Sequence, residues 1–278
     1  GDILFSTVRP NQKHYGIIEA GTENLLVSTG FTVVTVDTTI ADPYFIYYYL
    51  TQSSVIESLQ AIAEQSTSTY PSIKPSDIED IELDLPELET QKKIGSTLRM
   101  LDRKIALNEE INDNLEQQAQ SYFQELFVDN ADPEWTTGTI SDLGTVVGGS
   151  TPSKAKPEYY TESGIAWITP KDLSNNKSKF VSHGENDITE LGLRNSSASI
   201  MPEGTVLFSS RAPIGYIAIA AGEVTTNQGF KSVVPKPEIG TPFVYFFLKN
   251  TLPVIEGMAS GSTFKEVSGS TMKNVPAV

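Results

Sequence analysis

Apolar residues recur with alternating spacings of four and three between residues 86 and 132, which is the heptad pattern of a helix that pairs with another helix. Pro86 precedes the pattern and Asp132-Pro133 follows it, and both positions favour a helix boundary. We therefore predict a spacer helix over residues 87–132, roughly 60 Å long at ~1.5 Å per residue. The positions expected to contact a partner helix are Ile94, Leu98, Leu101, Ile105, Asn108, Asn112, Leu115, Tyr122 and Leu126. The small Ala119 continues the seam between Leu115 and Tyr122.

Two asparagines, Asn108 and Asn112, occupy consecutive positions of this seam. A buried Asn lowers the stability of a coiled coil but selects a partner and a register in which its amide is hydrogen-bonded. Alternatively, Leu107 and Ile111 make the contact at this level and both asparagines face water.

The other hydrophobic segments form two copies of one pattern, in residues 1–86 and 204–278. Each copy contains a strand, a turn with Arg and Pro, a second strand and a proline-initiated aromatic helix with core side chains. The matching segments are 3–5 with 206–208, 16–18 with 216–219, 42–50 with 241–248, and the Ser/Thr-rich 66–70 with 260–264. A repeat this long predicts two homologous domains.

Two further segments lie outside the matched pattern. Residues 78–83 alternate apolar and acidic side chains, which predicts a strand leading into the long helix. Residues 134–203 precede the second copy only, so the first copy lacks its front part. This arrangement indicates either a fragment or an unusual form of a longer repeated protein.

Composition adds limits on compartment and partners. The 278-residue chain has no cysteine, which excludes disulfides and thiolate metal sites and fits a cytoplasmic location. A formal net charge of −15 argues at first against a nucleic-acid partner. However, residues 77–134 hold 16 acidic and 5 basic side chains, a net charge of −11, so the flanking domains are near balance.

Short motifs occur in a fixed order across the chain. They are Gln91-Lys92-Lys93-Ile94, Asp102-Arg103-Lys104-Ile105, Gly148-Gly149-Ser150-Thr151-Pro152-Ser153, the segment 164–173 with Trp167-Ile168-Thr169-Pro170, Gly192-Leu193-Arg194, Ser209-Ser210-Arg211-Ala212-Pro213 and Thr226-Asn227-Gln228-Gly229. Together with the helix between two repeats, this series resembles the specificity subunits of type I restriction-modification systems over essentially the whole chain.

The resemblance implies an α+β protein in which two homologous mixed α/β target-recognition domains are joined by a long coiled-coil helix. Residues 1–86 would be the C-terminal part of the first domain, 87–132 the spacer helix and 133–278 the second domain. Such a subunit recognises a split DNA sequence. The family's spacer helices pack as an antiparallel pair, and two chains pairing their helices is an alternative here.

The resemblance also implies partners. Methyltransferase subunits would dock on the helices and bring S-adenosylmethionine, and a restriction subunit would bring ATP, Mg and DNA cleavage. This chain itself would carry no cofactor, no metal and no catalytic residue.

Candidate DNA contacts lie in loops between predicted strands. Lys and Arg neutralise phosphates, Arg also recognises guanine, and Asn or Gln recognises adenine. For the lysines the alternative is a solvated surface charge, and for Asn227 the alternative is closing a turn before Gly229. The residues expected to contact DNA are Arg9, Ser150, Thr151, Ser153, Lys154, Lys171, Ser210, Arg211, Asn227 and Gln228.

Two other classes of function compete with DNA recognition. An enzyme, that is a fused nuclease or methyltransferase, is disfavoured because the chain shows neither a carboxylate-Lys nuclease cluster nor an Asn-Pro-Pro-aromatic methyltransferase motif. With only two histidines and no nucleophile-elbow motif, a hydrolytic triad has little support. The second class is a coiled-coil scaffold whose flanking domains bind protein partners. A salt-sensitive interaction with DNA separates that class from a specificity subunit.

Overall fold

The computed structural model describes residues 1–19, 21–66, 70–261 and 265–277. The chain divides into two units, Gly1–Asn114 and Leu115–Val278, and the boundary falls within one helix, α4 (Leu88–Gln124). The Ser/Thr-rich repeat at 66–70 and 260–264 falls largely outside the described residues.

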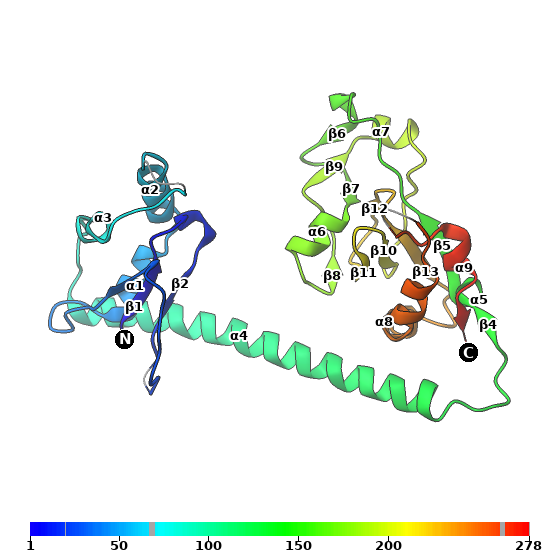
Figure 1. The fold of residues 1–278 in the computed structure, drawn as a ribbon, viewed down its shortest axis with the longest axis horizontal. Helices are drawn as coiled ribbons and strands as arrows, with labels where there is room; N and C mark the ends of the chain where they lie inside the picture. Colours follow the sequence, from blue (N-terminus) through cyan, green and yellow to red (C-terminus); the bar gives the residue numbers. More distant parts are fainter. Residues whose placement is uncertain (20, 67–69, 262–264, 278) are drawn as a thin grey trace. The chain divides into compact units, whose positions relative to one another are not determined.

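Unit 1, Gly1–Asn114, is built on a small antiparallel sheet (Figure 1). Its strands, in the spatial order β2-β1-β3, are β2 (Tyr15–Ile17), β1 (Ile3–Ser6) and β3 (Phe31–Val34), with the 3-10 turn η1 (Pro10–Gln12) between β1 and β2. The helices are α1 (Pro43–Leu50), α2 (Ser53–Glu64), α3 (Pro75–Glu79) and the first part of α4. The Asp42 carboxylate caps α1 by accepting from the Phe45 N–H at 2.9 Å, as expected for an Asp-Pro helix start.

Residues 78–83 do not form the predicted strand. Ile78 is buried within α3, which starts where the Lys74 N–H donates to the Asp77 carboxylate at 2.6 Å. The alternation of apolar and acidic residues therefore reflects one helical turn followed by an irregular segment. Ile78 packs in the unit 1 core with Ile3, Phe5 and Leu59.

Unit 2, Leu115–Val278, contains a five-stranded sheet and a four-stranded sheet. The first has the order β5 (Gly144–Gly148), β13 (Lys231–Pro235), β10 (Val206–Ser210), β11 (Ile214–Ala220) and β8 (Phe180–Val181). The second has the order β12 (Thr225–Thr226), β7 (Ile165–Ile168), β9 (Asn186–Ile188) and β6 (Tyr160–Thr161). Two parallel pairs, β11–β8 and β12–β7, occur among otherwise antiparallel ones.

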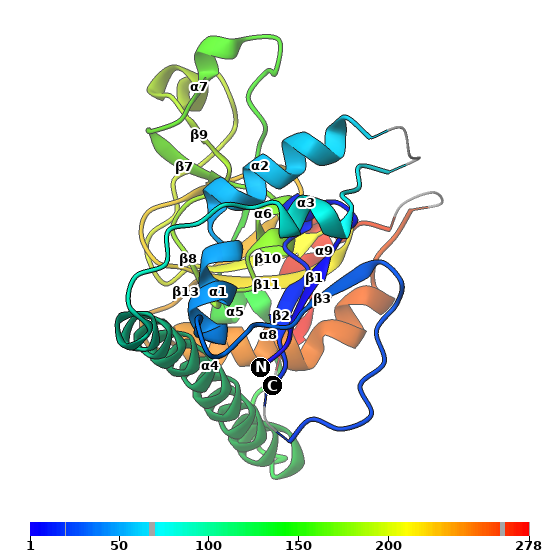
Figure 2. The same cartoon turned by 90° about the vertical axis from the view of Figure 1, so that its left-hand side faces the viewer.

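The remaining elements of unit 2 are short, apart from α8 (Thr241–Gly257). They are η2 (Glu125–Asp129), α5 (Ile140–Leu143), η3 (Pro157–Tyr159), α6 (Pro170–Asn175), α7 (Glu190–Arg194), α9 (Gly269–Lys273) and the strand pair β4 (Gly138–Thr139) with β14 (Pro276–Ala277). α8 contacts β10, β11 and β13 of the five-stranded sheet (Figure 2).

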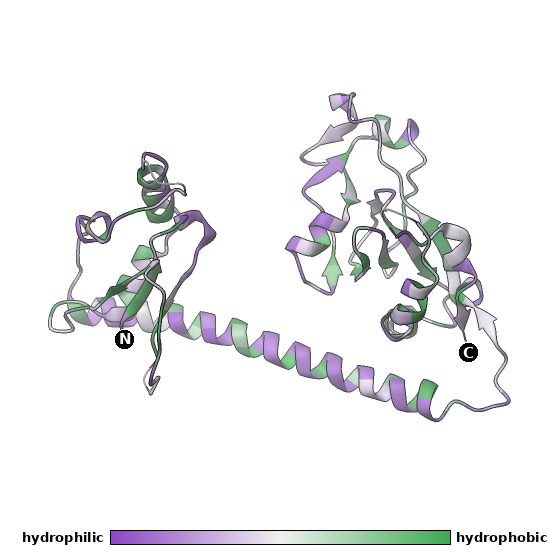
Figure 3. Cartoon of the chain, in the orientation of Figure 1, coloured by the Kyte–Doolittle hydropathy of each residue, from purple (hydrophilic) through white to green (hydrophobic). Residues whose placement is uncertain are grey.

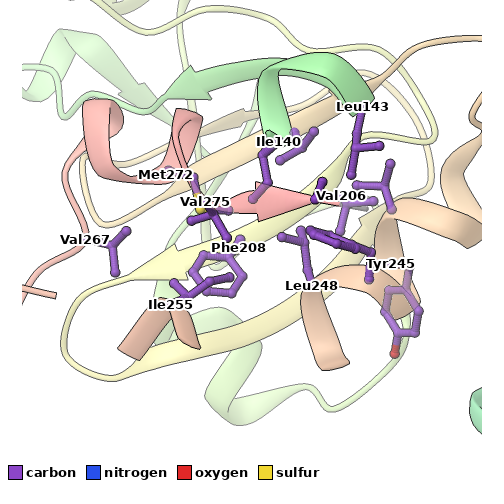
Figure 4. Close-up of a cluster of buried hydrophobic side chains, with 14 of the residues drawn as sticks. Ile140, Leu143, Val206, Phe208, Tyr245, Leu248, Ile255, Val267, Met272 and Val275 are labelled. Carbon is purple, nitrogen blue, oxygen red and sulfur yellow. The ribbon is translucent and has the colours of Figure 1, made fainter. Parts of the chain in front are cut away.

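The alternation of side chains along β10 fills two cores, one on each face of the sheet. Val206 and Phe208 pack with Leu248 and Ile255 of α8 and with residues of α5 and α9 (Figure 4). Leu207 packs on the other face with Ile168 and Leu173.

The predicted repeat is visible in strand order and register. Both sheets contain the same antiparallel triplet, β2-β1-β3 in unit 1 and β11-β10-β13 in unit 2. Ile3 pairs with Ile17 and Val34, and Val206 pairs with Ile219 and Val233. The short segments that precede α3 and α9 also match, because the Ile73 N–H donates to the Thr7 carbonyl and the Val267 N–H donates to the Ser210 carbonyl, each at 2.9 Å.

The two copies differ in what covers the triplet. In unit 2, Leu207 is fully buried under the second core, whereas the equivalent Leu4 of unit 1 is half-buried. Ser232 of β13 is fully buried beside β5, whereas the equivalent Val33 of β3 is 49% exposed. Residues 134–203, which form the extra strands of unit 2, have no counterpart within the described part of unit 1.

The long helix is confirmed, but it ends earlier than residue 132. α4 runs continuously for 37 residues to Gln124, and the π-helical turn η2 then follows. Figure 3 shows purple and green segments recurring along α4, as the heptad pattern predicts. Asn130 then ends η2 before Asp132-Pro133, because its backbone N–H and its side-chain amide both donate to the Glu125 carbonyl, at 3.1 and 2.9 Å.

Candidate nucleic-acid interface

A cleft of about 490 Å³ opens in unit 2 where four loops meet. The loops follow β5, join β7 to α6, join β10 to β11, and join β12 to β13, and residues beside β9 complete the wall. The lining residues are Thr151, Lys154, Trp167, Thr169, Pro170, Lys171, Asp172, Glu185, Asn186, Arg211, Ala212, Asn227, Gln228 and Gly229.

Six predicted DNA contacts line this cleft. They come from segments that are far apart in the sequence, and they are Thr151, Lys154, Lys171, Arg211, Asn227 and Gln228. The cleft therefore places three cationic side chains beside two amides and a hydroxyl. This combination supplies donors for phosphates and for base edges.

The loop between β12 and β13 is a tight turn held by Asn227. The Asn227 N–H donates to the Ile168 carbonyl at 3.0 Å, and the Asn227 Oδ1 accepts from the Gly229 N–H at 2.8 Å. A Cβ at Gly229 would lie 3.0 Å from a Pro170 side-chain carbon, so glycine fits this approach best. The turn-closing role considered for Asn227 is thus present, while its side-chain NH₂ is a further donor.

The glycine-rich segment after β5 packs directly on the same turn. A Cβ at Gly149 would overlap the Asn227 carbonyl oxygen and lie 2.5 Å from the Thr226 carbonyl oxygen. The Ser150 N–H donates to that Thr226 carbonyl at 2.9 Å. The segment therefore supports the recognition loop and presents Thr151, whose hydroxyl is hydrogen-bonded to Gln228.

Arg211 lies half-buried at one side of the cleft. Its guanidinium is 3.6 Å from one Glu266 oxygen, and the Lys231 ammonium is 3.6 Å from the other. Glu266 is a residue that sequence analysis missed, because only the fold brings it opposite the turn at Arg211. Glu266 thus pairs with two cations, and each ion pair stabilises the structure only modestly because it is long.

Lys171 lies opposite, at the start of α6. Its ammonium donates to Glu185 at 2.7 Å, and this hydrogen bond and charge raise the pKa of Lys171 above its usual value. Asp172 orders the loop, because its two oxygens accept from the Thr169 N–H at 2.7 Å and the Glu185 N–H at 2.8 Å. A Thr-x-x-Asp pair at a helix start is a recognisable signal for this capping.

The Trp167 side chain supports the glycine-rich segment after β5. The side chain is 6% exposed, so it is part of the core, yet it also lines the cleft. Its indole N–H donates to the Ser150 carbonyl at 3.0 Å, and its ring packs edge-on against Tyr160. This arrangement positions the Ser150 backbone rather than leaving the indole face free for stacking.

Three of the predicted serines lie outside the lining of the cleft. Ser210 is fully buried, and its hydroxyl donates to the Gly229 carbonyl at 3.1 Å. Its placement does not support a direct DNA contact; it supports the turn instead. The Ser150 hydroxyl accepts from the Ser197 N–H at 3.3 Å, and Ser153 is exposed.

Arg9 occupies the equivalent turn of unit 1. It has a left-handed backbone conformation with φ of 50°, and its guanidinium carbon lies 4.7 Å from the centre of the Tyr70 ring. In unit 2 the corresponding turn contains Ala212 with φ of 46°. Both copies therefore have a positive-φ residue in the turn that carries the arginine after the central strand.

The predicted partner-helix residues are exposed along α4 and η2. Their exposed fractions are 40% for Ile94, 36% for Leu98, 54% for Leu101, 58% for Ile105, 57% for Leu115, 62% for Tyr122 and 56% for Leu126, and Asn108 and Asn112 are also exposed. Leu107 and Ile111, the alternative contacts, are exposed too, at 53% and 46%.

A charged cluster that sequence analysis missed joins α4 to the rest of unit 2. Glu116 accepts from the Lys249 ammonium at 2.5 Å, the Tyr245 hydroxyl at 2.8 Å and the Lys179 ammonium at 2.8 Å. Burial opposes ionisation of Glu116, but these donors outweigh it and lower the pKa to about 2. Burial and the same carboxylate raise the pKa of Tyr245.

The described part of the chain holds neither a metal-ion cluster nor a membrane-spanning helix. No three His, Asp or Glu side chains there gather in an arrangement suited to a metal ion. Within the same residues, no helix has the length and apolar character required to cross a bilayer.

Comparison with known proteins places these features in a family. The model described as "Type I restriction modification DNA specificity domain" matches residues 1–117 and 133–276. The MjaIX specificity subunit of Methanocaldococcus jannaschii is 42% identical over 158 residues, which cover 56% of this chain and 36% of that protein. The HindI specificity subunit of Haemophilus influenzae is 26% identical over 95% of this chain and 73% of its own length.

A solved structure shows the same fold. The S subunit of a type I restriction-modification system from M. genitalium matches with a TM-score of 0.52 and 20% identity over 88% of this chain and 63% of that one. The family model matches both sides of the central helix, in agreement with the internal repeat. The chain therefore belongs to the family of type I restriction-modification specificity subunits.

Proposed function

We propose that the cleft of unit 2 recognises one part of a DNA target sequence. The observation that carries the proposal is the convergence of Lys154, Lys171 and Arg211 with Asn227 and Gln228 in one cleft. The cations suit phosphates, and the amides suit the adenine edge. Membership of a DNA-specificity family supports the same assignment.

The second half of a split target would be recognised by unit 1. The support is the shared strand triplet and the arginine in the same turn, Arg9 in unit 1 and Arg211 in unit 2. The region shared with this chain covers 36% of the MjaIX relative. Recognition of a whole split target is therefore proposed for the full-length protein.

The chain would act without a catalytic step of its own. Methyltransferase subunits would supply S-adenosylmethionine, and a restriction subunit would supply ATP, Mg and cleavage. The exposed apolar seam of α4 supports assembly through helix packing, because apolar side chains on a long helix are stabilised when a partner covers them.

Selection of bound duplexes from a random-sequence pool, followed by gel-shift titration, tests DNA recognition. We expect an enriched sequence whose affinity falls steeply as salt rises. Arg211→Ala should weaken binding to that sequence by about 1–3 kcal/mol. Arg194→Ala is the matched control, since Arg194 is also paired with a glutamate, Glu190 at 3.8 Å, but lies outside the cleft lining.

The outcomes separate the possible roles. Equal loss on every duplex would make Arg211 a phosphate contact, and equal effects of the two substitutions would contradict a role for the cleft. Salt-insensitive binding without any enriched sequence would favour a scaffold whose flanking domains bind proteins.

A further inference from the structure

The Arg211 guanidinium lines the cleft and lies beside a carboxylate. Its Nη1 atom is 3.6 Å from Glu266 Oε2, which is longer than a hydrogen bond, and the side chain is 36% exposed. Within the described residues the guanidinium makes no hydrogen bond. The carboxylate therefore neutralises the charge of Arg211 while its N–H donors stay available to a ligand.

The backbone holds Glu266 next to this arginine. Arg211 and Glu266 form an antiparallel β-bridge, and the Val267 N–H donates to the Ser210 carbonyl at 2.9 Å. Two more main-chain hydrogen bonds, at 2.9 and 3.1 Å, join Glu266 to Ser260. The carboxylate is thus placed by main-chain pairing as well as by the attraction between the two charges.

The other oxygen of Glu266 faces a second cation. The Lys231 ammonium lies 3.6 Å from Glu266 Oε1, and the Lys231 side chain is only 15% exposed. This ammonium also donates to the Gln228 carbonyl at 3.5 Å. Lys231 therefore fixes the carboxylate from the side of β13, and the Glu266 charge is shared between the two cations.

The equivalent arginine of unit 1 has a different neighbour. By main-chain pairing, Ser72 of unit 1 is the counterpart of Glu266. Arg9 lies over the Tyr70 ring, 4.7 Å from its centre, and forms no ion pair with the described residues. The carboxylate is therefore a feature of the arginine in unit 2 and not of the repeated turn.

A neighbouring carboxylate changes which part of DNA suits an arginine. Contact with a phosphate is favoured mainly by positive charge, which Glu266 offsets, and the carboxylate would repel the phosphate. The guanine edge is uncharged, and its O6 and N7 atoms accept two N–H groups from one guanidinium. A guanidinium that is already held in place loses less freedom on forming this pair of hydrogen bonds.

We propose that Arg211 recognises a guanine of the DNA target and that Glu266 is its positioning residue. This inference rests on the function proposed above for the cleft. It names the base that Arg211 selects and the side chain that holds Arg211 in place for that selection.

Gel-shift titration of the full chain tests the role of Arg211. The duplexes are the sequence enriched by selection and a set in which each of its base pairs is replaced in turn. We expect a guanine whose replacement weakens wild-type binding about tenfold or more. Arg211→Lys keeps the charge but removes the planar pair of donors. It should therefore remove most of that preference, with a smaller loss on duplexes that lack the guanine.

Glu266→Gln distinguishes positioning from a purely structural role. We expect the preference for the same guanine to fall about threefold or more. Duplexes that lack the guanine should bind more tightly, because a negative charge is removed. When Arg211→Lys is already present, Glu266→Gln should cause no further loss of preference. The matched control is Glu190→Gln, since Glu190 is paired with Arg194 outside the cleft lining, and it should leave the preference unchanged.

Circular dichroism verifies that each variant is folded. If Glu266→Gln is unfolded, Glu266→Asp replaces it, because it keeps the charge on a shorter side chain and should still lower the preference for guanine.

The outcomes separate this inference from the proposed function. A wild-type chain that enriches no sequence would overturn both. An enriched sequence without guanine, or a preference for guanine that survives Arg211→Lys, would overturn this inference alone. Equal loss on every duplex by Glu266→Gln, or the same loss of preference by Glu190→Gln, would show that Glu266 does not position Arg211.

Discussion

The Glu116 cluster connects the C-terminal part of α4 with the rest of unit 2. The Glu116 side chain is 23% exposed and accepts from Lys179, Lys249 and Tyr245. Removing one acceptor from three donors leaves partly buried cations without a counter-charge, which costs more than losing an exposed ion pair. The cluster therefore fixes the C-terminal part of α4 on its domain.

We predict that Glu116→Gln destabilises the chain by about 1–2 kcal/mol near neutral pH, after allowance for solvent screening. The folded-state pKa of about 2 lies below the ordinary value of 4.5, so the contribution is present above the ordinary value and is lost as pH falls from 4.5 to about 2. Denaturant unfolding across this range should show wild type and variant converging in acid. Glu110→Gln, exposed on the same helix, should change the unfolding free energy by less than about 0.5 kcal/mol. A constant difference at all pH values would contradict the charge explanation.

A second prediction at this scale compares two adjacent glycines. At Gly149 an added Cβ would overlap backbone of the 226–227 turn, whereas at Gly148 it would meet only a Lys231 side-chain carbon at 3.9 Å. We expect Gly149→Ala to cost about 1–3 kcal/mol of unfolding free energy and Gly148→Ala about 0.5 kcal/mol or less. Chemical denaturation measures both. Similar effects of the two substitutions would show that the segment does not pack on the turn as described.

Elements show which parts of the architecture a linear pattern can predict. Two strands of each triplet, the proline-initiated aromatic helices and α4 follow from local signals such as Asp42-Pro43 and the heptad seam, and all are present. Asp42 caps α1 as expected, whereas α8 has no side-chain cap, because the Thr241 hydroxyl donates to the Gly204 carbonyl instead. The strand expected at 78–83 is absent because Ile78 and Ile81 are three residues apart. This spacing puts both side chains on one face of a helical turn, where both pack in the unit 1 core, but on opposite faces of a strand.

The sequence predicted several residues that line the cleft, but not the glutamates that pair with them. Cations and amides in loops identified Lys154, Arg211 and Gln228, because those residue types suit DNA. Glu185 and Glu266, which pair with Lys171 and Arg211, come from segments that only tertiary packing brings close. The burial of Ser210 likewise depends on its facing the Gly229 carbonyl across the sheet.

The distribution of charge along the chain determines which surface can attract DNA. Residues 77–134 carry a net charge of −11 out of −15, so attraction to DNA depends on a local basic surface rather than on total charge. Lys154 is exposed and makes no ion pair with the described residues, whereas Lys171 is held by Glu185 at 2.7 Å. The two lysines therefore differ in the charge that they offer to a phosphate.

We predict that this difference appears in the salt dependence of DNA binding. Lys154→Ala should reduce the slope of log affinity against log salt by about 1, the value for one lost phosphate contact, and Lys171→Ala should reduce it by less. Glu185→Gln should tighten binding, because it releases Lys171 and removes a negative charge from the cleft. Gel-shift titrations at several salt concentrations measure all three. An unchanged slope for Lys154→Ala would mean that Lys154 makes no phosphate contact. Weaker binding by Glu185→Gln would mean that Glu185 positions Lys171 for DNA rather than competing with DNA for it.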